Sequence, residues 1–182
     1  MIQLGGAAVL CRAAADDPDA CAPAERRGQL GLEMGLRLAT HCLDRHTASG
    51  AGGAFEAGSM WEYIDDEGKP YMDGEGMVIS DPGHALEFVG LCGFFLREAA
   101  RLPEALVSEE QRATMGRLHA ALPLLLEVNF RECKPSASPS GLCLSKALCV
   151  ARQWLYRRGH LQSLRSSVWR AVQHRLAVVV AP

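Results

Sequence analysis

The sequence predicts an all-α fold made of antiparallel helix hairpins. Apolar residues recur at three- and four-residue steps in residues 23–46, in 81–100 and in the stretch after Ser108, which is the spacing of amphipathic helices. A short connection joins the last two helices, and consecutive helices joined in this way form an antiparallel hairpin. The 182 residues, 48% of them hydrophobic, suffice for a soluble domain with a core.

The N-terminal half is expected to hold two helices. Residues 1–15 form a short Ala-rich helix, which ends at a turn signal in residues 16–19. In the longer helix at 23–46, the expected apolar face advances by four residues through Leu30, Met34, Leu38 and Cys42, with Leu36 and Leu43 beside them. His41 and His46 lie in its last turn, where histidines commonly interact with the helix dipole.

A loop and a small hairpin are expected next. Residues 47–58 are rich in Gly and Ala, which favours a loop. Aromatic and apolar residues flank the turn at 66–69, which predicts an irregular β-hairpin between residues 60 and 80. The acidic residues here lack the regular alternation of a calcium-binding loop, so no metal site is predicted.

The two helices after this excursion have clear start signals. Asp81 can cap the first turn and Pro82 suits the first helical position, because its missing N–H would be unpaired there. Ser108 with Gln111 forms a capping box for the following helix. Pro123 is expected to kink that helix.

Charge divides the chain into two segments, 1–133 and 134–182. Residues 1–133 contain all 21 acidic residues and have a net charge of −10. Residues 134–182 contain no acidic residue and have a net charge of +8. The basic residues are scattered among Trp, Leu and Val rather than clustered, which argues against a nucleic-acid surface. The second segment is interpreted as basic and helical, at 142–158 and 163–180.

Several classes of function find no support in the sequence. The seven cysteines are odd in number, include no CxxC pair and follow no signal peptide, which favours free thiols in a reducing cytoplasm. No apolar stretch approaches the roughly twenty residues of a membrane helix. No phosphate loop, nucleophile elbow or dinucleotide fingerprint is present, and Cys143 and Cys149 match no zinc pattern, so neither a cofactor nor a metal is predicted.

His84 and Glu87 are the candidate catalytic residues. They lie three residues apart at a helix start, so their side chains share one face and can meet through a hydrogen bond or a common ligand. The positive end of the helix dipole is expected to keep His84 neutral, and therefore able to accept a proton. Pairs with this spacing also occur on many helix surfaces without a function.

These residues belong to a wider pattern that resembles a known family. Gly83-His84, Glu87-Phe88, the run Met60-Trp61-Glu62-Tyr63-Ile64-Asp65 and Gly68-Lys69-Pro70 resemble the N-acylglucosamine 2-epimerase family, which includes cellobiose 2-epimerases and mannose isomerases. The resemblance covers about residues 24–133. It implies an (α/α)6 toroid, in which the His opens an inner helix and is an acid/base residue. Phe88 stands where the family more often has Trp.

The resemblance implies epimerisation or aldose–ketose isomerisation at C2 of a free sugar, without a cofactor. His84 would transfer a proton, Glu87 would orient it or hold a substrate hydroxyl, and Trp61, Glu62 and Tyr63 would form the mouth. Twelve helices need roughly twice this length, so the chain is expected to form a partial toroid, which a homo-oligomer could complete.

Two alternatives remain open at this point. Family members carry a second catalytic His on a late helix, whereas His160 and His174 stand in no matching motif. The chain is then a truncated or diverged member, catalytically inactive, with a binding or scaffold role. In the other alternative, residues 134–182 form an interaction module that binds polyanions.

Overall fold

The computed structural model describes residues 2–16, 21–50 and 55–132. They form four α-helices and one 3-10 turn, so the all-α prediction is confirmed. The segment 134–182, the two helices predicted in it, and four of the seven cysteine side chains lie outside the described residues. The elements are α1 (Ile2–Asp16), α2 (Cys21–Arg45), α3 (Pro82–Ala99), η1 (Glu104–Leu106) and α4 (Glu109–Glu132).

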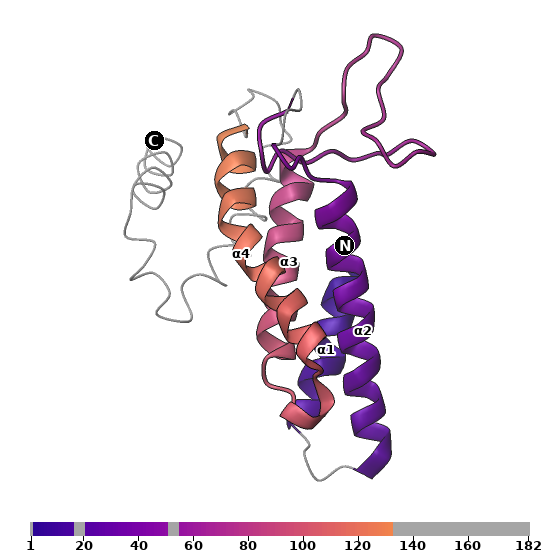
Figure 1. Cartoon of the computed structure of the whole chain (residues 1–182), viewed down its shortest axis with the longest axis vertical. Coiled ribbons are helices and arrows are strands. Elements are labelled where there is room, and N and C mark those ends of the chain that lie inside the picture. The colour runs from indigo at the N-terminus through magenta and orange to yellow at the C-terminus, as the bar shows by residue number, and fades with distance from the viewer. Residues whose placement is uncertain (1, 17–20, 51–54, 133–182) are drawn as a thin grey trace, which may run out of the picture.

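The four helices lie side by side in an elongated bundle (Figure 1). Helix α1 packs against both α2 and α3, and α3 also packs against α4. Arg101, just after α3, pairs with Asp16 at the end of α1, so these two helices run in the same direction. Arg117 near the start of α4 pairs with Asp44 near the end of α2. The bundle therefore consists of two hairpins, α1–α2 and α3–α4, packed against each other.

Three glycines of α2 face α1 and α3, beside the buried side chains of Leu32 and Leu36. Gly28, Gly31 and Gly35 share one face, and a Cβ on any of them would lie within 3.0 Å of a side-chain atom of α1 or α3. Leu30, predicted to be in the core, is 56% exposed. The prediction was wrong at this residue only, because Leu36 is buried and Met34, Leu38, Cys42 and Leu43 pack against the core.

A buried carboxylate joins α1 to α3. Glu98 is only 1% exposed, and it accepts hydrogen bonds from Arg97 at 2.5 Å and from Arg101 at 2.7 Å. Arg12 of α1 approaches the same carboxylate to 3.5 Å. Burial raises the pKa of Glu98, but the hydrogen bonds from the arginines outweigh it and hold the pKa below its usual value. Glu98 is thus ionised at neutral pH.

The segment between α2 and α3 projects beyond the end of the bundle (Figure 1). Its described residues form three isolated antiparallel bridges, Thr47–Met60, Ile64–Pro70 and Met72–Val78, rather than the continuous strands of the expected β-hairpin. The side chains of Asp65 and Asp73 hold the two turns of this segment, since each accepts hydrogen bonds from two backbone N–H groups of its own turn.

The predicted helix starts are confirmed. The Asp81 carboxylate accepts from the backbone N–H of Gly83 at 2.7 Å and of His84 at 3.4 Å, and Pro82 is the first residue of α3. Ser108 and Gln111 exchange the two hydrogen bonds of a capping box. Helix α4 continues through Pro123.

Candidate functional site

A pocket of about 150 Å³ lies where α2 ends and α3 begins. Residues from the end of α2, the start of the projecting segment and the first turns of α3 line it. Three of the five predicted site residues, His84, Trp61 and Glu62, are among them. The lining consists of Cys42, His46, Met60, Trp61, Glu62, Asp81, His84, Ala85 and Phe88.

His84 is held by a carboxylate that is distant in sequence. Its Nδ1–H donates to Glu62 Oε1 at 2.9 Å, and its Nδ1 lies 3.6 Å from Asp81 Oδ2. Glu62 reaches this position because its backbone N–H donates to the carbonyl of Ile79, which folds the segment back towards the start of α3. With Nδ1 donating to Glu62, a neutral His84 has its lone pair on Nε2.

The electrostatics of His84 differ from the prediction. The helix N-terminus was expected to keep the imidazole neutral, but the pKa of His84 is raised above its ordinary value. The main cause is the hydrogen bond to Glu62; burial opposes it, and the charges of Glu62, Asp81 and Glu87 add to the rise. The prediction failed because it considered the helix dipole and not the three carboxylates that the fold brings near the ring.

Two hydrogen bonds and one aromatic contact hold Trp61 in place. Its Nε1–H donates to the carbonyl of Arg45 at 2.9 Å, and its backbone N–H donates to the carbonyl of His46 at 3.1 Å. The ring of Phe55 lies 5.8 Å away, centroid to centroid, at a tilt of 50°. The indole therefore needs no ordering when a ligand binds, which suits a stacking surface for a flat apolar ligand face.

The other two predicted site residues lie outside the pocket lining. Glu87 makes no hydrogen bond or ion pair with any described residue, and it acts on His84 only through its charge. Tyr63 is 54% exposed on the projecting segment. The structure thus brings Glu62, rather than Glu87, into contact with His84.

The predicted site did not include six of the nine lining residues, and His46 is the one among them with an imidazole. His46 follows α2 and was predicted to serve only the helix dipole, but its Nδ1–H donates to the carbonyl of Trp61 at 3.1 Å. The only signal in the sequence was its position just before the loop that leads to Trp61. The other five are Cys42, Met60, Asp81, Ala85 and Phe88.

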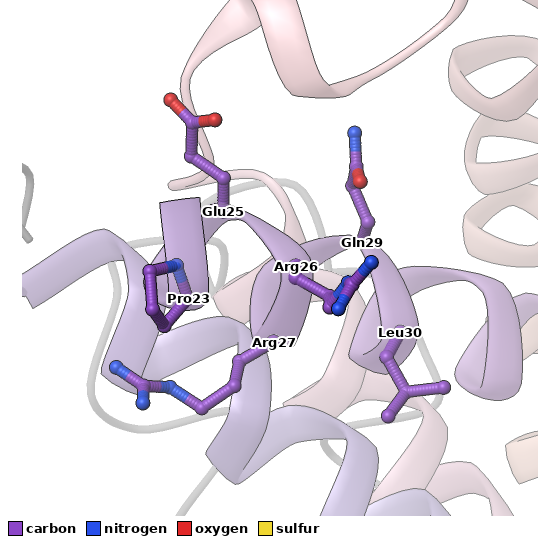
Figure 2. Close-up of a pocket in the computed structure, with 6 residues that line it drawn as sticks. All are labelled: Pro23, Glu25, Arg26, Arg27, Gln29 and Leu30. Atoms are coloured by element: carbon purple, nitrogen blue, oxygen red, sulfur yellow. The ribbon is translucent and has the colours of Figure 1, made fainter. Parts of the chain in front are cut away.

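A larger depression at the start of α2 does not form a comparable site. It has a volume of about 590 Å³ and is lined by Pro23 and neighbouring residues of α2 alone, and all of its lining residues are exposed. Figure 2 shows that their side chains point in different directions around the helix, with Glu25 and Gln29 on one side and Arg27 and Leu30 on the other. This depression is open surface along one helix rather than a site with convergent groups.

The described residues give no sign of a metal site or a membrane span. Among them, no group of three or more His, Cys, Asp or Glu side chains could hold a metal ion. None of the helices in 2–16, 21–45, 82–99 or 109–132 combines the length and the apolar character needed to cross a bilayer. No family model, curated protein or solved structure matches the chain.

Proposed function

We propose that the chain is a carbohydrate epimerase or isomerase, which acts at C2 of a free aldose or N-acylhexosamine by proton transfer through His84. The observation that carries the proposal is the hydrogen bond between His84 Nδ1 and Glu62. It orients the ring and leaves Nε2 to exchange a proton with a ligand, which is the arrangement of a general base held by a carboxylate.

The substrate class follows from the chemistry of this pocket and from the family resemblance. An open-chain aldose has an acidic C–H at C2, next to its carbonyl, and a neutral imidazole can remove this proton. Trp61 presents an indole that is already fixed, and stacking on indole suits the apolar face of a sugar. Glu87 and Tyr63, which lie outside the lining, are proposed to contact substrate hydroxyls at the mouth.

A partial (α/α)6 toroid is part of the same proposal. Two hairpins packed with α1 parallel to α3 and α2 parallel to α4 are what two successive repeats of such a toroid would form. At about 150 Å³, the pocket is below the roughly 300–1,000 Å³ usual for ligand sites. We therefore propose that a second copy of the chain contributes residues that complete the lining of this pocket.

Deuterium exchange tests the proposal. In D₂O, the protein should introduce deuterium at C2 of mannose or of an N-acylhexosamine, because an enediolate exchanges its proton with solvent. His84→Asn should slow this exchange on the order of a hundred-fold or more for the epimer whose C2 proton faces His84. The Asn side chain can still donate to Glu62, so the variant removes the base and keeps the contact.

The outcomes separate the proposed function from its alternative. Glu87→Gln serves as a graded control and should slow exchange less than His84→Asn, because Glu87 does not touch the imidazole. Equal exchange in wild type and His84→Asn would remove His84 from the mechanism. Absence of exchange with every aldose tested would favour a catalytically inactive member with a binding or scaffold role.

A further inference from the structure

The pocket contains a second imidazole, that of His46, which the proposed function does not use. His46 comes from the end of α2, whereas His84 comes from the start of α3, and both line the same 150 Å³ pocket. The two histidines are 38 positions apart in the sequence. Trp61 contacts His46, and the next residue, Glu62, contacts His84.

Each ring is oriented through its Nδ1 atom. His46 donates from Nδ1 to the backbone carbonyl of Trp61 at 3.1 Å, and His84 donates from Nδ1 to the carboxylate of Glu62 at 2.9 Å. Both acceptors belong to adjacent residues of one short segment. Because a carbonyl oxygen can only accept, the neutral tautomer of His46 carries its proton on Nδ1 and its lone pair on Nε2.

Nearby residues limit the other interpretations of His46. His41, on the same helix end, lies with its ring centroid 5.5 Å from that of His46 but does not line the pocket. A metal site is not supported, because no suitable group of ligands exists among the described residues. What remains is a half-buried imidazole in a pocket with a second imidazole, each with Nε2 available.

We propose that His46 is the second proton-transfer residue of this site, acting through Nε2 on the substrate carbon that His84 deprotonates. The inference rests on the proposed function and deepens it. Inversion at C2 needs a second proton-transfer group, because the new proton must arrive on the face opposite the one from which His84 removes it.

The proposed reaction balances without an external oxidant or reductant. His84 Nε2 takes the C2 proton, the C–H electron pair becomes the C1–C2 double bond, and the carbonyl pair moves onto O1. When the enediolate collapses, the pair on O1 re-forms the carbonyl, and the C1–C2 pair takes a proton from Nε2 of protonated His46. The product is the C2 epimer, and solvent then resets both imidazoles.

The test compares two epimers and two variants. In D₂O, wild type should exchange the C2 proton of both epimers and interconvert them. His46→Asn should keep the rate of C2 exchange for the epimer that His84 deprotonates. For the other epimer, the exchange rate should fall about a hundred-fold, and the two epimers should no longer interconvert. His84→Asn should show the reverse pattern. The control, His41→Asn, should leave all three rates unchanged, because His41 lies outside the pocket.

This reciprocal pattern is the sharp part of the test, because a merely structural role of His46 would slow both epimers alike. Wild-type behaviour of His46→Asn with both epimers would overturn the inference, as would equal losses with both. Wild type that exchanges neither epimer would instead overturn the proposed function, and this inference with it.

A measurement that does not depend on activity covers the case in which His46→Asn fails to fold. Nitrogen NMR of the wild-type chain should find neutral His46 protonated on Nδ1 and not on Nε2. Adding the sugar should then perturb the resonances of His46 and His84 and leave those of His41 in place. A neutral His46 with its proton on Nε2 would contradict the assignment.

Discussion

His84 and Glu62 are 22 residues apart in the sequence and joined by a hydrogen bond of 2.9 Å between Nδ1 and Oε1. Their side chains are 47% and 24% exposed, respectively, so the contact lies at the rim of the pocket rather than inside the core. It ties the projecting segment to the first turn of α3. The bond therefore affects both the titration of His84 and the position of the segment.

The first prediction concerns this titration. Glu62→Gln should lower the pKa of His84, because the variant removes the carboxylate that contributes most to the rise. Glu87→Gln should lower it less, since Glu87 contributes only through its charge. Proton NMR of the imidazole Cε1–H over pH 5–9 measures both shifts. A larger effect of Glu87→Gln would contradict the structural assignment.

The same contact predicts how stability depends on pH. The pKa of His84 is raised in the folded protein, so protonated His84 adds to the free energy of unfolding. This contribution is complete below the unfolded pKa of about 6.5, and it is lost as the pH rises through the folded pKa. The groups are partly exposed, so we expect a coupling free energy of about 0.2–1 kcal/mol. A double-mutant cycle of His84→Ala and Glu62→Ala, measured by urea unfolding at pH 5.5 and pH 9, should find a larger coupling at the lower pH.

Gly35 should not tolerate a side chain. A Cβ at this position would lie 2.1 Å from the ring of Phe95, which is fully buried. Gly35→Ala should therefore reduce the free energy of unfolding by about 1–3 kcal/mol or more. The matched control is Gly116→Ala in α4, where nothing lies within 4 Å, and it should stabilise by up to about 1 kcal/mol. Equal effects in urea unfolding would contradict this packing.

Glu98 should contribute to stability only when ionised. Its lowered pKa means that the contribution is present above the unfolded pKa, about 4.3, and is lost as pH falls through the folded value. Glu98→Gln should destabilise by about 1–3 kcal/mol at pH 7, with a smaller difference near pH 3. The control, Glu67→Gln, breaks an exposed pair with Lys69 and should change stability little.

Two cysteines should resist alkylation in the folded protein. Burial raises the pKa of Cys11 and of Cys92 to about 12, so at pH 8 almost no thiolate is available to react. Peptide mapping after brief iodoacetamide treatment should find both unmodified, and both should react in denaturant. Rapid modification of either thiol under native conditions would contradict its burial.

The proposed second copy predicts association. Large apolar side chains are exposed on three helices and on the projecting segment, and apolar patches much above a few hundred Å² are rare on monomers. Sedimentation should therefore detect association that increases with concentration. A compact monomer that binds no ANS over the same range would argue against a second copy. The exposed side chains include Val9, Leu30, Leu124, Tyr71, Met72 and Met77.

Local signals predicted the helices well and the packing of their faces poorly. The starts at Asp81 and Ser108 were correct because a cap is a contact between residues two or three apart. The predicted core face of α2 was wrong at Leu30, which is exposed, and it omitted Gly31 and Gly35, which contribute no apolar surface of their own. Their importance depends on the helices that pack against them.

The candidate site divides in the same way. Spacing along one helix paired His84 with Glu87, because side chains three residues apart share a face. The structure pairs His84 with Glu62, through a chain reversal that backbone hydrogen bonds create. His46 was missed for the same reason, since its contact with Trp61 spans a loop.

The sequence by itself determined the helical class, the position of each described helix and the residue types available for proton transfer, because these depend on interactions within a few residues. Only the tertiary structure decided which carboxylate holds His84, which histidine joins it in the pocket and which glycines of α2 face the neighbouring helices. These features depend on contacts between segments tens of residues apart, and the physical reason is that such contacts form only when the helices pack together.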